Sequence, residues 1–241
     1  MNFLTLARSA LDLVYPRQCR VCHTGEGCDR FPFLCDDCFD GAPRLEPPCC
    51  EICSLPVPGR VDVPFDCPNC REGHMHFERA FAVMRFRGAV RHAIHELKYN
   101  RHVYWARPLL AWLTTGVDRK LARGEIDCIT CVPLYPVRER ERGFNQAWLL
   151  GEALGRHWQV PTVRGVLVRR RDTETQTHLN RTERIANLKN AFALGRDGVV
   201  KGKRILLVDD VLTTGSTTSE CARILLKGGA ASVLVFTLAR G

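Results

Sequence analysis

Two adjacent carboxylates and a hydroxyl-rich loop lie close together near the end of this 241-residue chain. Asp209 and Asp210 end the apolar run RILLV, and a TTGST segment (213–217) follows before a helical pattern. Paired carboxylates can accept hydrogen bonds from a vicinal diol. Hydroxyls and backbone N–H groups at a helix N-terminus favour an anion, and glycine allows close approach. A diol beside a phosphate is the geometry of ribose 5-phosphate, so we predict a sugar-phosphate site here.

This segment resembles the phosphoribosyl-pyrophosphate (PRPP) motif of type I phosphoribosyltransferases, in which an apolar strand and two acids precede TTGST. The resemblance implies that Asp209 and Asp210 bind the ribose hydroxyls and help to stabilise an oxocarbenium-like transition state. It also implies a cradle for the 5-phosphate, made of Thr213, Thr214, Gly215, Ser216 and Thr217. Members that salvage 6-oxopurines usually carry a base-activating Asp where this chain has Thr213. The segment therefore predicts ligand binding, and it leaves the acceptor of any transfer open.

Two arginine-rich segments could complete the site. VPLYPVRERERGFNQA (132–147) places Arg138 and Arg142 where a pyrophosphate would lie, and guanidinium forks form bidentate bonds to phosphate oxygens. The polar segment 169–192 is typical of a loop that closes over a polyphosphate and excludes water. Its candidate ligands are Gln176, Arg181 and Arg184. Either segment could instead be solvated, and the second could follow a nucleic-acid backbone.

Ten of the 13 cysteines precede residue 71, and eight of them form Cys-x-x-Cys pairs. The first two pairs are 12 residues apart and the last two are 13 apart. Two such knuckles close a tetrahedral zinc site, so we predict two structural Zn²⁺ ions rather than disulfides or redox thiols. The predicted ligands are Cys19, Cys22, Cys35 and Cys38 for one ion, and Cys50, Cys53, Cys67 and Cys70 for the other. Cys49 could replace Cys50, but only Cys50 keeps the spacing to Cys53.

The composition is that of a globular protein, with 45% hydrophobic and 25% charged residues and a net charge of +9. This charge favours an anionic partner, although a solvated basic surface would have the same composition. No apolar run approaches the roughly 20 residues that span a bilayer. The first residues have no continuous apolar stretch either, so we expect a cytoplasmic protein without membrane insertion.

The elements that must position these residues fall into three predicted parts. Residues 1–15 are expected to form an amphipathic helix, residues 16–76 a double zinc ribbon, and residues 77–241 an α/β domain. In the last part, expected strands alternate with helices, which predicts a mostly parallel sheet with flanking helices. The strands are expected at 81–86, 126–134, 166–170, 204–210 and 231–239, and the helices at 89–97, 108–113, 144–158 and 217–227. Ligands bind at the carboxyl ends of such strands, where both phosphate-binding candidates lie.

The order of these motifs, together with LKYNRH and TETQTHLNRTERIANLKNAF, resembles the ComF/GntX family. That resemblance implies a type I phosphoribosyltransferase-like domain behind a zinc-ribbon segment, Mg²⁺ bound with PRPP, and a link to DNA uptake in natural transformation. Two functions remain open: phosphoribosyl transfer, or a non-catalytic adaptor that senses a sugar phosphate or nucleotide. The adaptor would dock single-stranded DNA or a helicase-like partner. Residues 16–75 hold six arginines against ten acids, which favours a protein partner for the ribbons.

Overall fold

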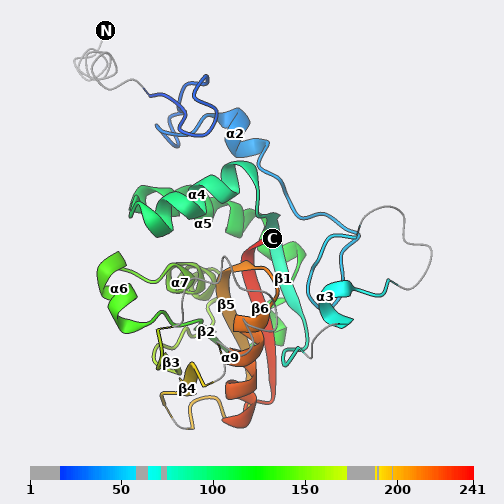
Figure 1. The fold of residues 1–241 in the computed structure, drawn as a ribbon. Coiled ribbons are helices and arrows are strands. Elements are labelled where there is room, and N and C mark those ends of the chain that lie inside the picture. Colours follow the sequence, from blue (N-terminus) through cyan, green and yellow to red (C-terminus); the bar gives the residue numbers. More distant parts are fainter. Residues whose placement is uncertain (1–16, 58–64, 72–74, 173–187, 189, 197) are drawn as a thin grey trace.

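The computed structural model describes residues 17–57, 65–71, 75–172, 188, 190–196 and 198–241 (Figure 1). Its centre is a sheet of four parallel strands in the order β1-β6-β5-β2. These strands are β1 (Ala80–Arg85), β6 (Ser232–Arg240), β5 (Arg204–Leu212) and β2 (Cys128–Cys131). The predicted helix at 1–15 lies outside the described residues. The predicted α/β class with a parallel sheet is confirmed.

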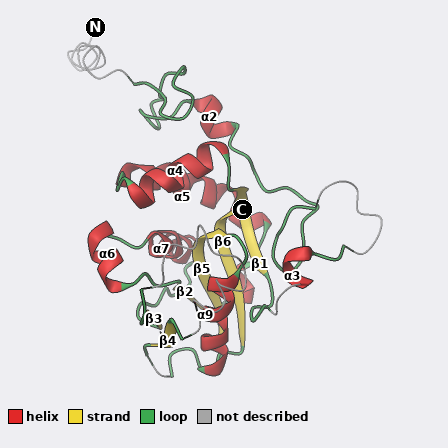
Figure 2. Cartoon of the chain, viewed as in Figure 1, coloured by secondary structure: helices red, strands yellow, loops and turns green. Residues whose placement is uncertain are grey.

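Helices cover both faces of this sheet, as the red and yellow elements of Figure 2 show. One face packs against α4 (Gly88–Tyr99), α5 (Ala106–Gly116) and α7 (Gln146–Trp158). The other face packs against α9 (Ser216–Lys227) and an antiparallel pair, β3 (Leu167–Arg169) and β4 (Phe192–Leu194). The remaining elements are α2 (Asp36–Asp40), α3 (Pro68–Arg71), α6 (Pro136–Arg142), η1 (Val103–Trp105), η2 (Val117–Arg119) and η3 (Arg123–Glu125).

Strand β5 shows why the fold has three layers. Successive strand residues point to opposite faces. Leu206 and Val208 belong to the core under α4, α5 and α7, whereas Ile205 and Leu207 belong to the core under α9. An apolar run without alternation is typical of a strand buried on both faces. The run RILLV therefore specifies a central strand, and the structure places it between β6 and β2.

The segment between β2 and α7 differs from the sequence prediction. Strand β2 ends at Cys131, before the expected limit of 134, because Pro133 has no N–H to continue the ladder. A helix, α6, then forms in a segment for which no helix was predicted. Pro136 at its first turn has a preset φ, and Gly143 ends it in the left-handed region at φ +83°. Strand β4 was not predicted either.

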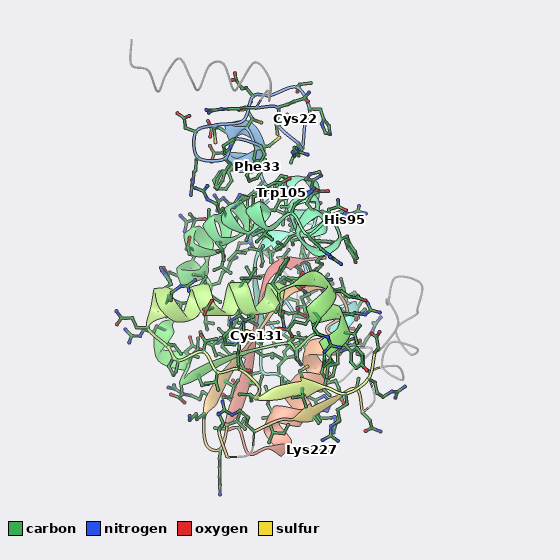
Figure 3. The ribbon with its side chains drawn as sticks, turned by 90° about the vertical axis from the view of Figure 1, so that its left-hand side faces the viewer. Cys22, Phe33, His95, Trp105, Cys131 and Lys227 are labelled. Carbon is green, nitrogen blue, oxygen red and sulfur yellow. The ribbon has the colours of Figure 1, made fainter. Side chains whose placement is uncertain are left out.

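The two cysteine-rich segments dock at different places. The first, residues 17–45, packs on η1 and α5: the rings of Phe33 and Trp105 lie 4.8 Å apart, and Figure 3 shows them facing each other below Cys22. The second segment, which carries α3, lies beside β1 (Figure 1). There the Ala80 N–H donates to the Ile52 carbonyl at 2.7 Å. Across the ranges that the structure describes, no helix is both long and apolar enough to span a bilayer.

Candidate functional site

The two predicted carboxylates, Asp209 and Asp210, lie within β5, as the predicted strand 204–210 implied. The strand continues to Leu212, so the acids remain part of the sheet. Backbone N–H groups hold both side chains: that of Asp210 donates to Asp209 Oδ1 at 2.9 Å, and that of Val211 donates to Asp210 Oδ1 at 3.0 Å. The acids are therefore fixed near the backbone at the carboxyl end of the sheet, the edge at which α/β folds bind ligands.

Strand alternation gives the two acids different surroundings. Asp210 shares its face with Leu206 and Val208, under α4 and α7, and is only 5% exposed. Asp209 points to the face covered by α9 and is half-buried. The helices over the sheet bury Asp210. We therefore expect the two acids to differ in their roles.

A lysine that the sequence analysis did not select neutralises Asp210. Lys98 Nζ, near the end of α4, lies 2.5 Å from Asp210 Oδ2. Both side chains are largely buried, with exposed fractions of 21% for Lys98 and 7% for Asp210. Burial works to lower the pKa of Lys98, but the charges of Asp210 and Asp209 outweigh it and raise that pKa above its ordinary value. Lys98 thus remains a cation at the edge where the ligand is expected.

The Asp209 carboxyl is held partly protonated by its surroundings. Burial, followed by the charge of Asp210, raises the pKa of Asp209 to about 8. A divalent cation beside this carboxyl would favour its ionised form. Mg²⁺ prefers carboxylate oxygens and phosphate oxygens as ligands, so the donor set at Asp209 and Asp210 fits this ion.

The phosphate-loop candidate, residues 213–217, has the backbone of an anion-binding turn. Gly215 precedes α9 with φ +79°, a conformation that favours glycine. Because glycine has no side chain to cap the helix, the first N–H groups of this 12-residue helix can face a ligand. Thr214 Oγ1 and Ser216 Oγ lie 3.0 Å apart, and Thr218 Oγ1 donates back to the Gly215 carbonyl at 3.0 Å. Hydroxyls and N–H groups therefore converge on one turn.

The RGFNQ segment joins the sheet to α7. Asn145 Oδ1 accepts hydrogen bonds from the N–H groups of Ala147 (2.9 Å) and Trp148 (3.3 Å), which caps the helix. Asn145 Nδ2 donates to the carbonyl of Val132 at 3.0 Å, just beyond β2. Since Asn145 is buried, this one side chain fixes α7 against the end of the strand.

The two predicted pyrophosphate ligands lie on α6 with different partners. Arg138 Nε donates to Asp172 Oδ1 at 2.8 Å, which connects α6 to the described start of the predicted closing segment 169–192. Arg142 donates to Gln146 Oε1 and is half-buried. Burial lowers the pKa of Arg142, while the charge of Asp210 works in the opposite direction. The other predicted ligands of this group lie outside the described residues: Gln176, Arg181 and Arg184.

The structure brings together both predicted cysteine sets. They are Cys19, Cys22, Cys35 and Cys38, and Cys50, Cys53, Cys67 and Cys70, with the sulfurs of each set within 4.8 Å of one another. A tetrahedral ion with Zn–S bonds of about 2.3 Å sets its sulfurs about 3.8 Å apart. The Cys22–Cys35 sulfur distance is 3.8 Å and the Cys53–Cys67 distance is 3.6 Å. Both sets therefore fit structural zinc.

Local hydrogen bonds support the same interpretation. The Gly25 N–H points at Cys22 Sγ (3.3 Å) and the Cys38 N–H at Cys35 Sγ (3.4 Å), as expected where backbone amides wrap a thiolate knuckle. Cys49 stays outside the second set and donates to a backbone carbonyl at 3.3 Å. The two-residue spacing thus identified Cys50 correctly.

Comparisons with known proteins agree with this architecture. The phosphoribosyl transferase domain family matches residues 148–241. The DNA utilization protein YhgH of Salmonella typhi is 34% identical over 235 residues, covering 95% of this chain and 99% of that protein. The chain belongs to the ComF/YhgH family. Competence protein F of Haemophilus influenzae is 32% identical over 178 residues, covering 72% of this chain and 78% of that protein.

Among solved structures, a purine phosphoribosyltransferase from Pyrococcus horikoshii superposes with a TM-score of 0.34 and 16% identity, over 57% of this chain and 84% of that one. This score is low, and membership of the ComF/YhgH family rests on the sequence relatives. The family assignment confirms the resemblance that the motif order indicated.

Two residues of this ComF/YhgH protein escaped the sequence analysis. Lys98 directly follows the predicted helix 89–97, and Arg240 directly follows the predicted strand 231–239; neither was selected as a site residue. Each contacts a partner distant in sequence, Asp210 for Lys98 and Cys53 for Arg240. For Arg240, a charged residue at the end of an otherwise apolar strand was a signal; Lys98 ends a helix with several other polar residues, so its sequence position did not distinguish it.

Proposed function

We propose that this ComF/YhgH-family protein binds PRPP, or a closely related sugar phosphate, together with Mg²⁺ at the carboxyl end of β5. We further propose that it transfers the phosphoribosyl group to an acceptor. The observation that carries the proposal is the junction of β5 and α9. Two anchored carboxylates there precede a hydroxyl-rich glycine turn that opens α9 without a side-chain cap.

Each part of the ligand has a candidate partner. Asp209 and Asp210 would accept hydrogen bonds from the ribose hydroxyls. The loop 213–217 would bind the 5-phosphate through the start of α9. Arg138 and Arg142 of α6 would hold the pyrophosphate, joined on closure by Gln176, Arg181 and Arg184. A +9 net charge supports the binding of so anionic a ligand.

The transfer requires the C1–oxygen bond to the pyrophosphate to break, with the bonding electron pair leaving on the pyrophosphate. Positive charge then develops on the ribose ring, and the anchored carboxylates would stabilise it without reorganising. Arg138 and Arg142 would stabilise the negative charge on the departing group. Mg²⁺, when bound, would neutralise part of the pyrophosphate charge. The acceptor's lone pair completes the reaction at C1.

The test is a calorimetric titration of the full-length protein with PRPP in the presence and absence of Mg²⁺. The wild type is expected to bind, and Asp209→Asn/Asp210→Asn to bind at least about tenfold more weakly, since each lost charged hydrogen bond is worth about 1.5–3 kcal/mol. Asp127→Asn is the matched control, because Asp127 pairs with Arg204 at the opposite end of β5. Absence of PRPP binding by the wild type would overturn the proposal.

A second candidate function, binding without turnover, is favoured by Thr213. Its hydroxyl cannot serve as the general base that some phosphoribosyltransferases place at this position. In this case the protein would sense a sugar phosphate or nucleotide and act as an adaptor for a helicase-like protein or single-stranded DNA. PRPP binding without pyrophosphate release, over a panel of bases and amines, would decide for the adaptor.

The names of the relatives connect either function to DNA. Proteins called DNA utilization protein and competence protein F are similar to this chain over most of their length. We therefore propose that its sugar-phosphate site acts in the uptake or use of DNA. Loss of DNA-dependent transformation or growth in cells carrying Asp209→Asn/Asp210→Asn, with the protein still present, is the expected result.

A further inference from the structure

The second cysteine set and the phosphate loop share one buried arginine. Arg240, the last residue of β6, is only 3% exposed. Its Nε donates to the carbonyl of Cys53 at 2.9 Å, and its Nη1 donates to the carbonyl of Leu212 at 2.9 Å. Leu212 directly precedes the loop 213–217. A single guanidinium therefore joins a predicted metal ligand to the residue at which the phosphate-binding turn begins.

The charge of this arginine suits a loaded metal site. Its Nη2 lies 3.8 Å from Cys53 Sγ. Four thiolates around Zn²⁺ carry a net charge of about −2, which a buried guanidinium compensates. A hydrogen bond to a metal-bound thiolate also orients that ligand, as outer-sphere partners do in other metal sites. Metal at this set would thus hold Arg240 in the position from which it bonds Leu212.

Met75 and His76, which follow Cys70 in the chain, contact the phosphate loop and the first turn of α9. The Sδ and Cε atoms of Met75 lie 3.3 Å from where a Cβ on Gly215 would be. The His76 N–H donates to Ser219 Oγ, in the first turn of α9, at 3.1 Å. The turn is therefore contacted on both sides: Leu212 by Arg240, which also bonds Cys53, and Gly215 and Ser219 by Met75 and His76, which follow the second cysteine set in the chain.

The first cysteine set is placed differently. Its segment packs on η1 and α5, where Phe39 stacks on Trp112 with ring centroids 5.3 Å apart. Trp112 Nε1 also donates to the Phe39 carbonyl at 3.0 Å. The two sets thus offer a built-in comparison, since one metal site adjoins the phosphate loop and the other adjoins a helix.

We propose that metal at the second cysteine set, acting through Arg240, holds the phosphate loop in its ligand-binding conformation, and that metal at the first set does not. Arg240 is a positioning residue in this scheme, since it acts on the ligand through Leu212. The proposal rests on the sugar-phosphate function for its effect on affinity, but its effect on the loop is independent of any ligand. Linkage requires the reverse effect too: a bound sugar phosphate must increase the affinity of the second set for its metal.

The experiment uses the full-length zinc protein and four variants. Cys70→Ser and Cys38→Ser each remove the last, half-buried cysteine of one set. Arg240→Met removes the guanidinium but leaves all eight predicted ligands, and Arg240→Lys keeps the charge with fewer directed donors. Zinc content, hydrogen exchange of peptides spanning 209–219, and PRPP affinity with Mg²⁺ are measured for each.

We expect Cys70→Ser and Arg240→Met to speed exchange in the loop and to weaken PRPP binding about tenfold, with Arg240→Lys in between. Cys38→Ser should leave loop exchange and PRPP affinity within about twofold of the wild type, because its set is remote from the loop.

Unchanged loop exchange in a folded, two-zinc Arg240→Met protein would overturn the proposal, as would equal effects of Cys38→Ser and Cys70→Ser. If Cys70→Ser does not fold, loop exchange in Arg240→Met still tests the proposal. Should the wild type not bind PRPP, the proposed function falls and loop exchange alone decides this proposal.

Discussion

Lys98 and Asp210 form a buried ion pair, with 2.5 Å between Nζ and Oδ2, at the edge of the sheet where the sugar-phosphate ligand is expected. The pair joins α4 to the central strand β5. It gives a carboxylate that is 7% exposed a cation to compensate its charge, which an isolated buried acid would lack. A ligand hydroxyl or a metal ion that approaches Asp210 Oδ2 must therefore share this oxygen with the Lys98 ammonium group.

Replacing Lys98 by methionine should destabilise the protein, because it leaves the Asp210 carboxylate buried without its partner. We expect a loss of about 3 kcal/mol in the free energy of unfolding, measured by urea denaturation. The double variant Lys98→Met/Asp210→Asn should recover much of this loss, since it removes both charges. If the double variant is as unstable as the sum of the two single variants, the pair does not act as a unit.

The stability of the protein should fall as the pH rises from 5 to 9. Asp209 has a pKa of about 8 in the folded state, above its ordinary value of 3.8, so the folded state holds a proton that the unfolded state releases. Stability from this group is therefore complete below pH 4 and is lost as the pH rises toward 8. Asp209→Asn should flatten the curve by roughly 1–3 kcal/mol over this range.

A matched carboxylate tests this assignment. Hydrogen bonds from Arg204 lower the pKa of Asp127 to about 2, so its contribution changes only below pH 4. Asp127→Asn should leave the slope between pH 5 and 9 as it is in the wild type. An unchanged slope in Asp209→Asn would show that another group titrates there.

The purified protein should contain two Zn²⁺ ions per chain, measured by elemental analysis. Cys53→Ser is expected to reduce the content to about one, because a three-thiolate set binds zinc much more weakly. Cys128→Ser should keep both ions, since Cys128 is a buried residue of β2 outside either set. Chelation of the metal should lower the melting temperature, and no zinc in the freshly purified protein would contradict the ribbon assignment.

Gly215→Ala should weaken phosphate binding as well as stability. An alanine at φ +79° is strained by about 1–2 kcal/mol, and its Cβ would lie 3.3 Å from Met75. Gly198 has a similar φ of +76°, and a Cβ there would enter open space, with no atom of the described residues beyond its chain neighbours within 4 Å. Gly198→Ala should therefore lose similar stability without touching the loop. Titration with PRPP separates a loss of binding from a loss of stability. Equal affinities of Gly215→Ala and Gly198→Ala would contradict a special role for Gly215.

The sequence was a good guide wherever local chemistry decides the outcome. The four Cys-x-x-Cys pairs predicted both sulfur sets, because two thiolates on one knuckle must face the same ion. The apolar run before Asp209 predicted a strand at 204–210, and its burial on both faces explains why the run lacks alternation. The start of α9 was predicted at 217 and lies at Ser216, as a glycine turn before a helical pattern requires.

Tertiary packing decided which residues far apart in the chain contact each other. No helix was predicted around Arg138 and Arg142, yet Pro136 and Gly143 bound a helix on which the two arginines have separate partners, Asp172 and Gln146. The sequence pattern made Asp209 and Asp210 look equivalent, whereas packing of α4 and α7 buries one and leaves the other half-exposed. Periodicity along one element carries no information about which charged group lies across from it.

Local sequence was enough to specify the chemical groups of this protein: two sets of four thiolates, a pair of carboxylates at the end of a strand, and a hydroxyl-rich turn that opens a helix. Each of these depends on neighbours within a few residues. The folded arrangement, in contrast, was needed to pair Lys98 with Asp210 and to place Arg240 between Cys53 and Leu212. Those contacts join residues far apart in the chain, and they form because the parallel sheet and its covering helices exclude water from one shared edge.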